Sequence, residues 1–332
     1  MEETIDDPLL RNVLSGASMT MELDTEKLPL YVFAQINNSF IQSAWRLEGG
    51  GSLIADKLAG NIIRMGGTIV RNAEVTRLVE ESGEISIVEV NNEEQIQAKH
   101  IISNIHPAAT LALIPESQYI RNLYRRRITN LSNTFGMFTV HLKLKEKSIQ
   151  YQNRNKFIYK DRQVWNPIDD TEKDFSRVLV SYQIPEDGSD FTSNIDILFP
   201  IGWEEVKKWE NSSVGRREEE YNQFKQQKAE EYIRLVSEYI PNLKESIESY
   251  YTSTPLTYRD YTATWQGSAY GVQKDYNSIL LTLLTPQTPV PNLLLTGQNL
   301  NLHGILGVTM TSFFTCAKLV GMENLVNDLD KF

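Results

Sequence analysis

The sequence has few cysteines and histidines and no excess of basic charge. Its single cysteine, Cys316, excludes a disulfide within the chain and a metal site built from several cysteines. The four histidines show no spacing typical of metal ligands, so we expect no metal site. With 33 basic against 43 acidic side chains and a net charge of −10, the chain lacks the dense basic face that a nucleic-acid partner requires.

Long apolar runs are also missing. No stretch approaches the roughly 18 consecutive apolar residues of a membrane span. The acidic start, MEETIDDPLL, lacks the basic-then-apolar order of a signal peptide. Together with the single cysteine, these absences predict a cytoplasmic protein and leave peripheral membrane association open.

Several catalytic motifs do not occur. The dinucleotide fingerprint G-x-G-x-x-G is absent, because Gly49 and Gly51 are the only glycines two apart and Ile54 occupies the third position. The chain also lacks G-K-[ST], G-x-S-x-G and H-E-x-x-H. A P-loop enzyme, a serine hydrolase and a zinc hydrolase are therefore poorly supported, and no catalytic residue is assigned.

The first half of the chain predicts a helix followed by short strands. Ile54, Leu58 and Ile62 share one face of a helix at 52–65, with Ser52 as its amino-terminal cap and Gly66 in a left-handed conformation after its last turn. Strands are predicted at 68–70, 74–79, 84–90, 95–98 and 100–104, with a hairpin turn at 91–92. This order fits an α/β sheet with a small antiparallel flap.

The second half predicts an inserted domain and a return to α/β character. Strands at 136–142 and 177–182 precede a long helix that we expect to end at Pro241. A buried strand at 293–296 then leads to an apolar helix at 307–320. That helix is expected to be buried, with Cys316 in the core and Gly321 as its cap.

Three glycines near the last strand are the main candidate site. Gly297, Gly304 and Gly307 would let the backbone approach a flat or anionic group, and the following helix would direct its free amides to the same place. The alternative is a tight turn without a ligand. Gly49 to Gly51 carry the same two interpretations, and His303 is either a cofactor contact or a buried imidazole.

Four strings resemble, in order, the FAD-dependent phytoene desaturase, carotenoid isomerase and retinol saturase group of oxidoreductases. They are LYVFAQINNSFIQSAWRLEGGGSLIADKLAGNIIRMGGTIVRNAEVTRL, HIISNIHPAAT, TPLTYRDYTATWQGSAYGV and LLLTGQNLNLHGILGVTMTSFFTCAKLVG. The resemblance implies an α/β fold, with an incomplete doubly wound FAD-binding domain and an inserted α+β substrate domain. The implied ranges are a substrate-domain segment and linker at 1–44, the FAD-binding domain at 45–108 and 255–332, and the substrate domain at 109–254.

The resemblance also implies ligands and roles. The cofactor would be FAD, with NAD(P) as an electron donor or acceptor, and the substrate an apolar polyene, isoprenoid or related lipid. The reaction would be desaturation, saturation or isomerisation at a carbon–carbon bond. The implied cofactor-binding residues are Gly50, Gly51, Ser52, Val75, Gly297, Gln298, His303, Gly304, Gly307 and Val308.

The sequence departs from this family at its beginning. Family members open with a strand, the glycine fingerprint and a helix, followed by an acidic residue for the ribose. This sequence starts downstream of those features, so we expect a carboxy-terminal portion that needs a separate amino-terminal chain or a longer product to bind FAD. The alternatives are a non-redox lipid- or isoprenoid-binding protein on the same scaffold and a truncated inactive fragment.

Overall fold

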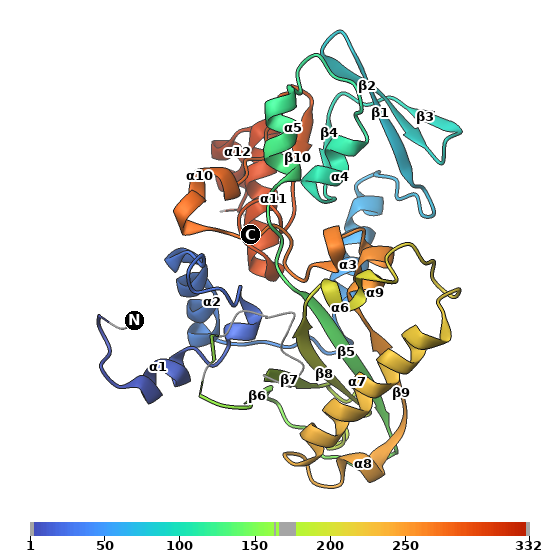
Figure 1. Ribbon diagram of the computed structural model, residues 1–332. Helices are drawn as coiled ribbons and strands as arrows, with labels where there is room; N and C mark the ends of the chain where they lie inside the picture. Colours follow the sequence, from blue (N-terminus) through green and yellow to red (C-terminus); the bar gives the residue numbers. More distant parts are fainter. Residues whose placement is uncertain (1–2, 163, 166–176, 330–332) are drawn as a thin grey trace. The chain divides into compact units, whose positions relative to one another are not determined.

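The computed structural model describes residues 3–162, 164–165 and 177–329 (Figure 1). Contacts between residues divide the chain into two compact units. The first unit comprises residues 1–69, 135–262 and 266–269, and the second comprises 70–134, 263–265 and 270–332. Residues 45–69 belong to the first unit. The domain boundaries expected from the sequence, which place 45–108 in the FAD-binding domain, stay a prediction.

The first unit is built on a five-stranded antiparallel sheet in the order β6-β7-β8-β5-β9. The predicted strands at 136–142 and 177–182 are confirmed as β5 and β7. The strands are β5 (Gly136–Leu144), β6 (Lys156–Tyr159), β7 (Arg177–Tyr182), β8 (Asn194–Ile201) and β9 (Ile247–Ser253).

One face of this sheet packs against α7 (Glu219–Ser237), which lies across the strands in Figure 1. Phe138 and Phe199 on the sheet stack with ring centroids 4.8 Å apart, and Tyr232 of α7 stacks on Phe199. Alternation along β8 sends every second side chain into this core. The helix ends at Ser237, earlier than expected, because Pro241 restricts the residue before it and the chain turns first.

Short helices complete the first unit. They are α1 (Pro8–Leu14), η1 (Ser18–Thr20), α2 (Leu30–Gln42), α3 (Ser52–Arg64), α6 (Glu204–Lys207), α8 (Leu243–Ser246) and α9 (Pro255–Thr262). A turn of 3₁₀ helix, η2 (Trp265–Gly267), has Trp265 in the second unit and its other two residues in the first.

The predicted helix at 52–65 is confirmed as α3, and Gly66 has the expected positive φ of 86°. The predicted cap was wrong, because Gly51 occupies the cap position and the Ser52 side chain accepts no capping hydrogen bond. Ser52 is instead the first helical residue. The apolar face of α3 is exposed, at Leu58 and Ile63 among others.

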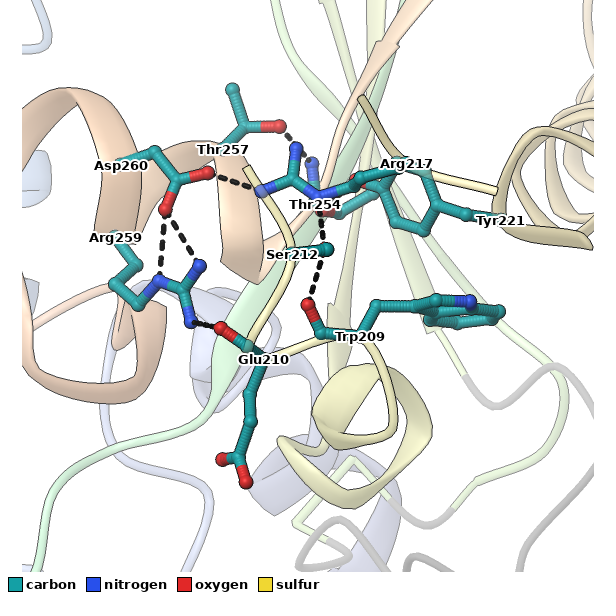
Figure 2. A network of polar contacts seen from close by, with 9 residues as sticks. All are labelled: Trp209, Glu210, Ser212, Arg217, Tyr221, Thr254, Thr257, Arg259 and Asp260. Atoms are coloured by element: carbon teal, nitrogen blue, oxygen red, sulfur yellow. Dashed lines mark hydrogen bonds and ion pairs between the residues drawn. The ribbon is translucent and has the colours of Figure 1, made fainter. Parts of the chain in front are cut away.

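A polar network fixes α9 to the loop between α6 and α7 (Figure 2). The Asp260 carboxylate pairs with both Arg217 and Arg259. Arg259 also donates to the carbonyl of Glu210 (2.7 Å), and Arg217 donates to the hydroxyl of Ser212 (3.1 Å). Because the Arg217 and Asp260 side chains are mostly buried, these bonds hold the loop against α9 with little competition from water.

The second unit contains two small sheets. β1 (Val75–Glu81), β2 (Glu84–Val90) and β3 (Glu94–Ile96) are antiparallel, and β4 (Ile101–Ser103) is parallel to β10 (Leu293–Leu295). Asn91 and Asn92 have φ of 53° and 58°, which is typical of the expected hairpin turn. The strand predicted at 68–70 was wrong, because no described strand pairs with these residues and a strand needs a ladder partner.

The helices of the second unit are α4 (Pro107–Ala112), α5 (Asn122–Thr129), η3 (Tyr276–Ser278), α10 (Ile279–Thr282), α11 (Gly304–Val320) and α12 (Met322–Leu329). The Thr315 hydroxyl of α11 donates to the Leu295 carbonyl of β10 (2.9 Å), so one stripe of the helix packs on the strand.

The predictions that α11 is buried and that Cys316 lies in the core were wrong. Its buried residues are Gly307, Thr311 and Thr315, whereas Ile305 is 67% exposed and Cys316 is exposed. The apolar composition of α11 indicates that several of its faces need to be packed against other residues. Within the described residues, only the stripe of α11 formed by Gly307, Thr311 and Thr315 is buried.

Candidate functional site

The candidate site lies where β4 and β10 end. Because the two strands are parallel, their carboxyl ends meet at one edge, which is where open α/β sheets bind ligands. β10 leads into Gly297, whose φ is 94°. A Cβ on Gly297 would lie 2.2 Å from Oδ1 of Asn104, the residue that follows β4. The positive φ favours glycine here, and the missing Cβ leaves room for the Asn104 side chain.

The start of α11 presents free amides beside open space. The side chain of its cap residue, His303, makes no capping bond to the first-turn N–H groups. Gly304 has φ of 77°, and a Cβ at this residue would meet nothing within 4 Å. The Thr296 hydroxyl is buried and has no hydrogen-bond partner among the described residues. A polar group from a ligand would satisfy these donors and suit the helix dipole.

The other predicted residues of this turn differ in their surroundings. Gln298 and Val308 are half-buried. Gly307 is buried, and a Cβ there would lie 2.3 Å from the Leu302 carbonyl oxygen. Close packing of the helix against Leu302 therefore explains the glycine at 307, whereas open space surrounds Gly304.

The segment 270–274 holds this turn in place. The ring of Tyr270 stacks on His303 with centroids 4.1 Å apart, and Val272 N–H donates to Asn299 Oδ1 (3.1 Å). Lys274 is only 4% exposed, and its ammonium donates to the carbonyls of Asn299 (2.7 Å), Leu300 (3.2 Å) and Thr282 (3.1 Å). Three carbonyl groups thus converge on one buried cation, which fixes the backbone that enters α11.

His106 follows β4 and is held as a neutral imidazole. Its Nδ1 accepts from Ala108 N–H (3.2 Å) and so caps α4, which leaves the proton on Nε2 to be donated to Asn133 Oδ1 (2.9 Å). Burial lowers the pKa of His106; the bond to Asn133 opposes this shift, and the nearby Lys274 charge adds to it. The imidazole, which stacks on Trp265, is therefore a structural cap.

The remaining predicted cofactor residues lie elsewhere. Val75 begins β1, pairs with Val90, and is 38% exposed. Gly50, Gly51 and Ser52 belong to the first unit, where Gly50 and Gly51 have open space at the Cβ position. The structure thus brings together the residues from Gly297 to Val308, whereas a shared site with Gly50, Gly51, Ser52 and Val75 stays a prediction.

A second group of titratable side chains lies on the sheet of the first unit. His141 of β5 bonds through Nδ1 to Asp196 Oδ1 (2.7 Å) and through Nε2 to the Ser253 hydroxyl (3.1 Å). Tyr251 stacks on its ring. All four side chains point away from the face that packs on α7, because they alternate with core residues along their strands. No local pattern in the sequence indicated this group, since its members come from three separate strands.

Sequence reasoning also missed Asn104, Asn299 and Lys274. An available signal was the position of Asn104 at the end of the strand predicted at 100–104. Lys274 offered none, because a lysine in a polar-looking loop is usually solvated. Among the described residues, no group of three or more His, Cys, Asp or Glu side chains could hold a metal ion. No helix in this part of the chain has the length and apolarity to cross a membrane.

Comparison with known proteins identifies distant relatives of this chain. No family model matches the sequence. All-trans-retinol 13,14-reductase of Rattus norvegicus is 25% identical over 346 residues, which cover 97% of this chain and 56% of that protein. The enzyme of the same name from Danio rerio is 24% identical and is also 56% covered. The chain is a distant relative of the all-trans-retinol 13,14-reductases. The predicted resemblance to the retinol saturase group is thereby confirmed, and the chain spans a little over half the length of these relatives.

Two solved structures share the fold. An oxidoreductase from Methanosarcina mazei superposes with a TM-score of 0.60 at 16% identity, covering 93% of this chain and 65% of that one. The PF1083 protein from Pyrococcus furiosus has a TM-score of 0.54 at 14% identity, covering 95% and 64%. The mixed α/β fold of this chain therefore corresponds to part of each of these longer chains.

Proposed function

We propose that the chain is the carboxy-terminal portion of an FAD-dependent oxidoreductase that acts on a carbon–carbon bond of an apolar polyene, isoprenoid or related lipid. The open, uncapped start of α11 beside Gly304 is the observation that carries this proposal. The distant retinol reductase relatives support the reaction class.

The residues at the end of β10 would hold the ring end of the cofactor. The Thr296 hydroxyl, Gly297, Gln298 and the first amides of α11 from Gly304 onward supply donors there. When bound, FAD would accept or deliver hydride at the substrate. Lys274 and Tyr270 would keep these donors in position, so orientation supplies much of the catalysis.

The proposal requires a strand–fingerprint–helix segment that this sequence lacks. In the described residues, β4 pairs only with β10, and Ile102 of β4 is exposed. A parallel sheet is normally covered on both faces and continued by further strands. We propose that such a segment, from a separate amino-terminal chain or a longer product, pairs with β4 and supplies the pyrophosphate site.

The experiment is reconstitution. The chain is expressed alone and with the amino-terminal part of the rat retinol reductase supplied as a second chain, and both preparations are examined for flavin absorbance. Two results would support the proposal. The pair of chains should bind flavin, and the absorbance of an added polyene should decrease when the flavin-loaded pair is reduced anaerobically. Colourless protein in both preparations would exclude the holoenzyme.

A flavin-free binding function is the second candidate. It is favoured by a cavity of about 550 Å³ in the first unit, none of whose lining residues is a candidate FAD residue. The cavity is lined by Pro8, Arg11, Asn12, Ser15, Thr25, Leu28, Leu30, Phe33 and Trp165. Two further features stay proposals. They are peripheral contact with a membrane, and NAD(P) as the electron donor or acceptor that the family resemblance implies.

A further inference from the structure

Three polar side chains on the sheet of the first unit are hydrogen-bonded in series. Nδ1 of His141 lies 2.7 Å from Asp196 Oδ1, and its Nε2 lies 3.1 Å from the Ser253 hydroxyl oxygen. A carboxylate only accepts hydrogen bonds, so the neutral imidazole carries its proton on Nδ1 and donates it to Asp196. Nε2 then accepts, and the Ser253 hydroxyl is the donor. A serine, an imidazole and a carboxylate connected in this order are a nucleophile, its general base and the group that orients the base.

The pairing of three strands holds this group in place and leaves it accessible. In the ladder of β5 with β8 and β9, His141 lies directly opposite Asp196 on one side and Tyr251 on the other. The Tyr251 ring stacks on the imidazole with centroids 4.4 Å apart, which fixes the plane of the base. The side chains of His141 and Asp196 are 26% and 47% exposed, and Ser253 is half-buried. A small molecule can therefore reach the serine while the strands hold the three groups in register.

Neighbouring side chains on the same face supply a donor and an apolar surface. Thr139 lies opposite Ser253 in the register of β5 and β9, and its hydroxyl is 3.4 Å from that of Tyr258. Because directly opposed residues have Cβ atoms about 5 Å apart, the Tyr258 hydroxyl lies near the serine. It is a donor for an oxyanion formed there. Leu198 lies opposite Thr139 on β8, and Leu179 lies opposite Leu198 on β7, so an apolar surface adjoins the polar group.

We propose that Ser253 is the nucleophile of an esterase site for carboxylic esters with a short apolar acyl group. Its Oγ bonds to the ester carbonyl carbon and passes its proton to Nε2 of His141. That proton goes to the alcohol oxygen as the ester C–O bond breaks. Water then attacks the acyl-serine and gives a proton to His141, which returns it to Ser253. Ester and water thus become acid and alcohol, and Asp196 is a positioning residue that holds the imidazole tautomer.

The absence of G-x-S-x-G does not conflict with this site. The motif describes a serine on a turn between a strand and a helix, whereas Ser253 is the last residue of β9. Serine, histidine and carboxylate groups of this kind are defined by their geometry and occur in several chain orders. The site needs no flavin, so it does not rest on the function proposed above.

The test is labelling of the flavin-free full chain with an alkyl fluorophosphonate, which phosphonylates an activated serine and releases fluoride. Intact-mass measurement counts the adducts, and peptide fragmentation locates them. We expect a single adduct on the folded chain, at Ser253, and none on the chain unfolded in urea. Ser249 is a matched internal control, because it is an exposed serine of the same strand and the same face. Absence of the adduct from Ser253, or equal labelling of Ser249, would overturn the proposal.

Variants separate a chemical role from a structural one. Ser253→Ala and His141→Gln should each lower the hydrolysis of p-nitrophenyl butyrate by about 100-fold or more, whereas Ser249→Ala should act like the parent. Asp196→Asn should lower kcat by about tenfold or more and leave KM unchanged, because the amide donates to Nδ1 and moves the imidazole proton to Nε2. Thermal unfolding checks that each variant is folded, and the labelling of the parent chain is decisive where one is not. Equal hydrolysis by the parent and a folded Ser253→Ala would overturn the proposal.

Discussion

The ring of Tyr270 stacks on the imidazole of His303, with centroids 4.1 Å apart and an angle of 21° between the planes. This contact joins the segment 270–274 to the residue at the amino-terminal cap position of α11. Tyr270→Ala should lower the free energy of unfolding by about 1 kcal/mol, because a stacked aromatic pair contributes about this much in addition to the apolar area that it buries. Tyr270→Phe should retain most of the stability. Urea unfolding checks both, and equal losses in the two variants would show that the phenol oxygen matters more than the stack.

Lys274 should be needed for the fold of the second unit. Lys274→Met keeps the volume of the aliphatic stem but leaves three buried carbonyls without their shared donor. We expect a loss of about 2–4 kcal/mol in the free energy of unfolding. The exposed Lys318→Met is the control and should change stability by less than about 0.5 kcal/mol. Similar values for the two variants would contradict the role given to Lys274.

Gly304 and Gly307 should respond differently to side chains. Gly307→Ala places a Cβ against the Leu302 carbonyl and should cost about 1–3 kcal/mol, because backbone must shift. Gly304→Asn meets open space, and asparagine tolerates a positive φ, so it should cost less than about 1 kcal/mol. Thermal unfolding of the two variants gives the comparison. The reverse order would mean that the space beside Gly304 is filled in solution.

His106 should make stability depend on pH. Its folded pKa lies below its ordinary value of 6.5, so the unfolded chain binds the proton more readily. The stabilisation is therefore complete above about pH 6.5 and falls as the pH decreases toward the folded pKa. Denaturant titrations between pH 7.5 and 5 should show a shallower decline for His106→Gln than for the parent. Parallel curves would exclude His106 as the titrating group.

Local patterns allowed several elements to be predicted. The period of Ile54, Leu58 and Ile62 predicted α3, and the apolar run before Thr296 predicted β10. The turn from Gly297 to Gly304 was identified because glycines stood between a strand and a helix. Such features depend on neighbours in sequence, which a single chain displays directly.

Features that depend on distant partners could not be predicted. The exposure of Cys316 depends on what covers α11, and composition reports only the need for cover. Lys274 and Asn299 meet because two loops pack together, and His141 and Asp196 meet because β5 and β8 pair in one register. The resemblance to a known family supplied the function class, whereas these contacts came from the structure.

The most direct test of the central claim is flavin retention by the reconstituted pair carrying a bulky residue at the start of α11. Gly304→Phe fills the open space there, and Gly188→Phe is matched to it, since Gly188 also has a positive φ and open space but lies in the first unit. The account predicts that Gly304→Phe lowers flavin affinity by about tenfold or more, as for the loss of at least 1.4 kcal/mol, whereas Gly188→Phe binds flavin like the parent pair. Equal flavin retention by the two variants would contradict it.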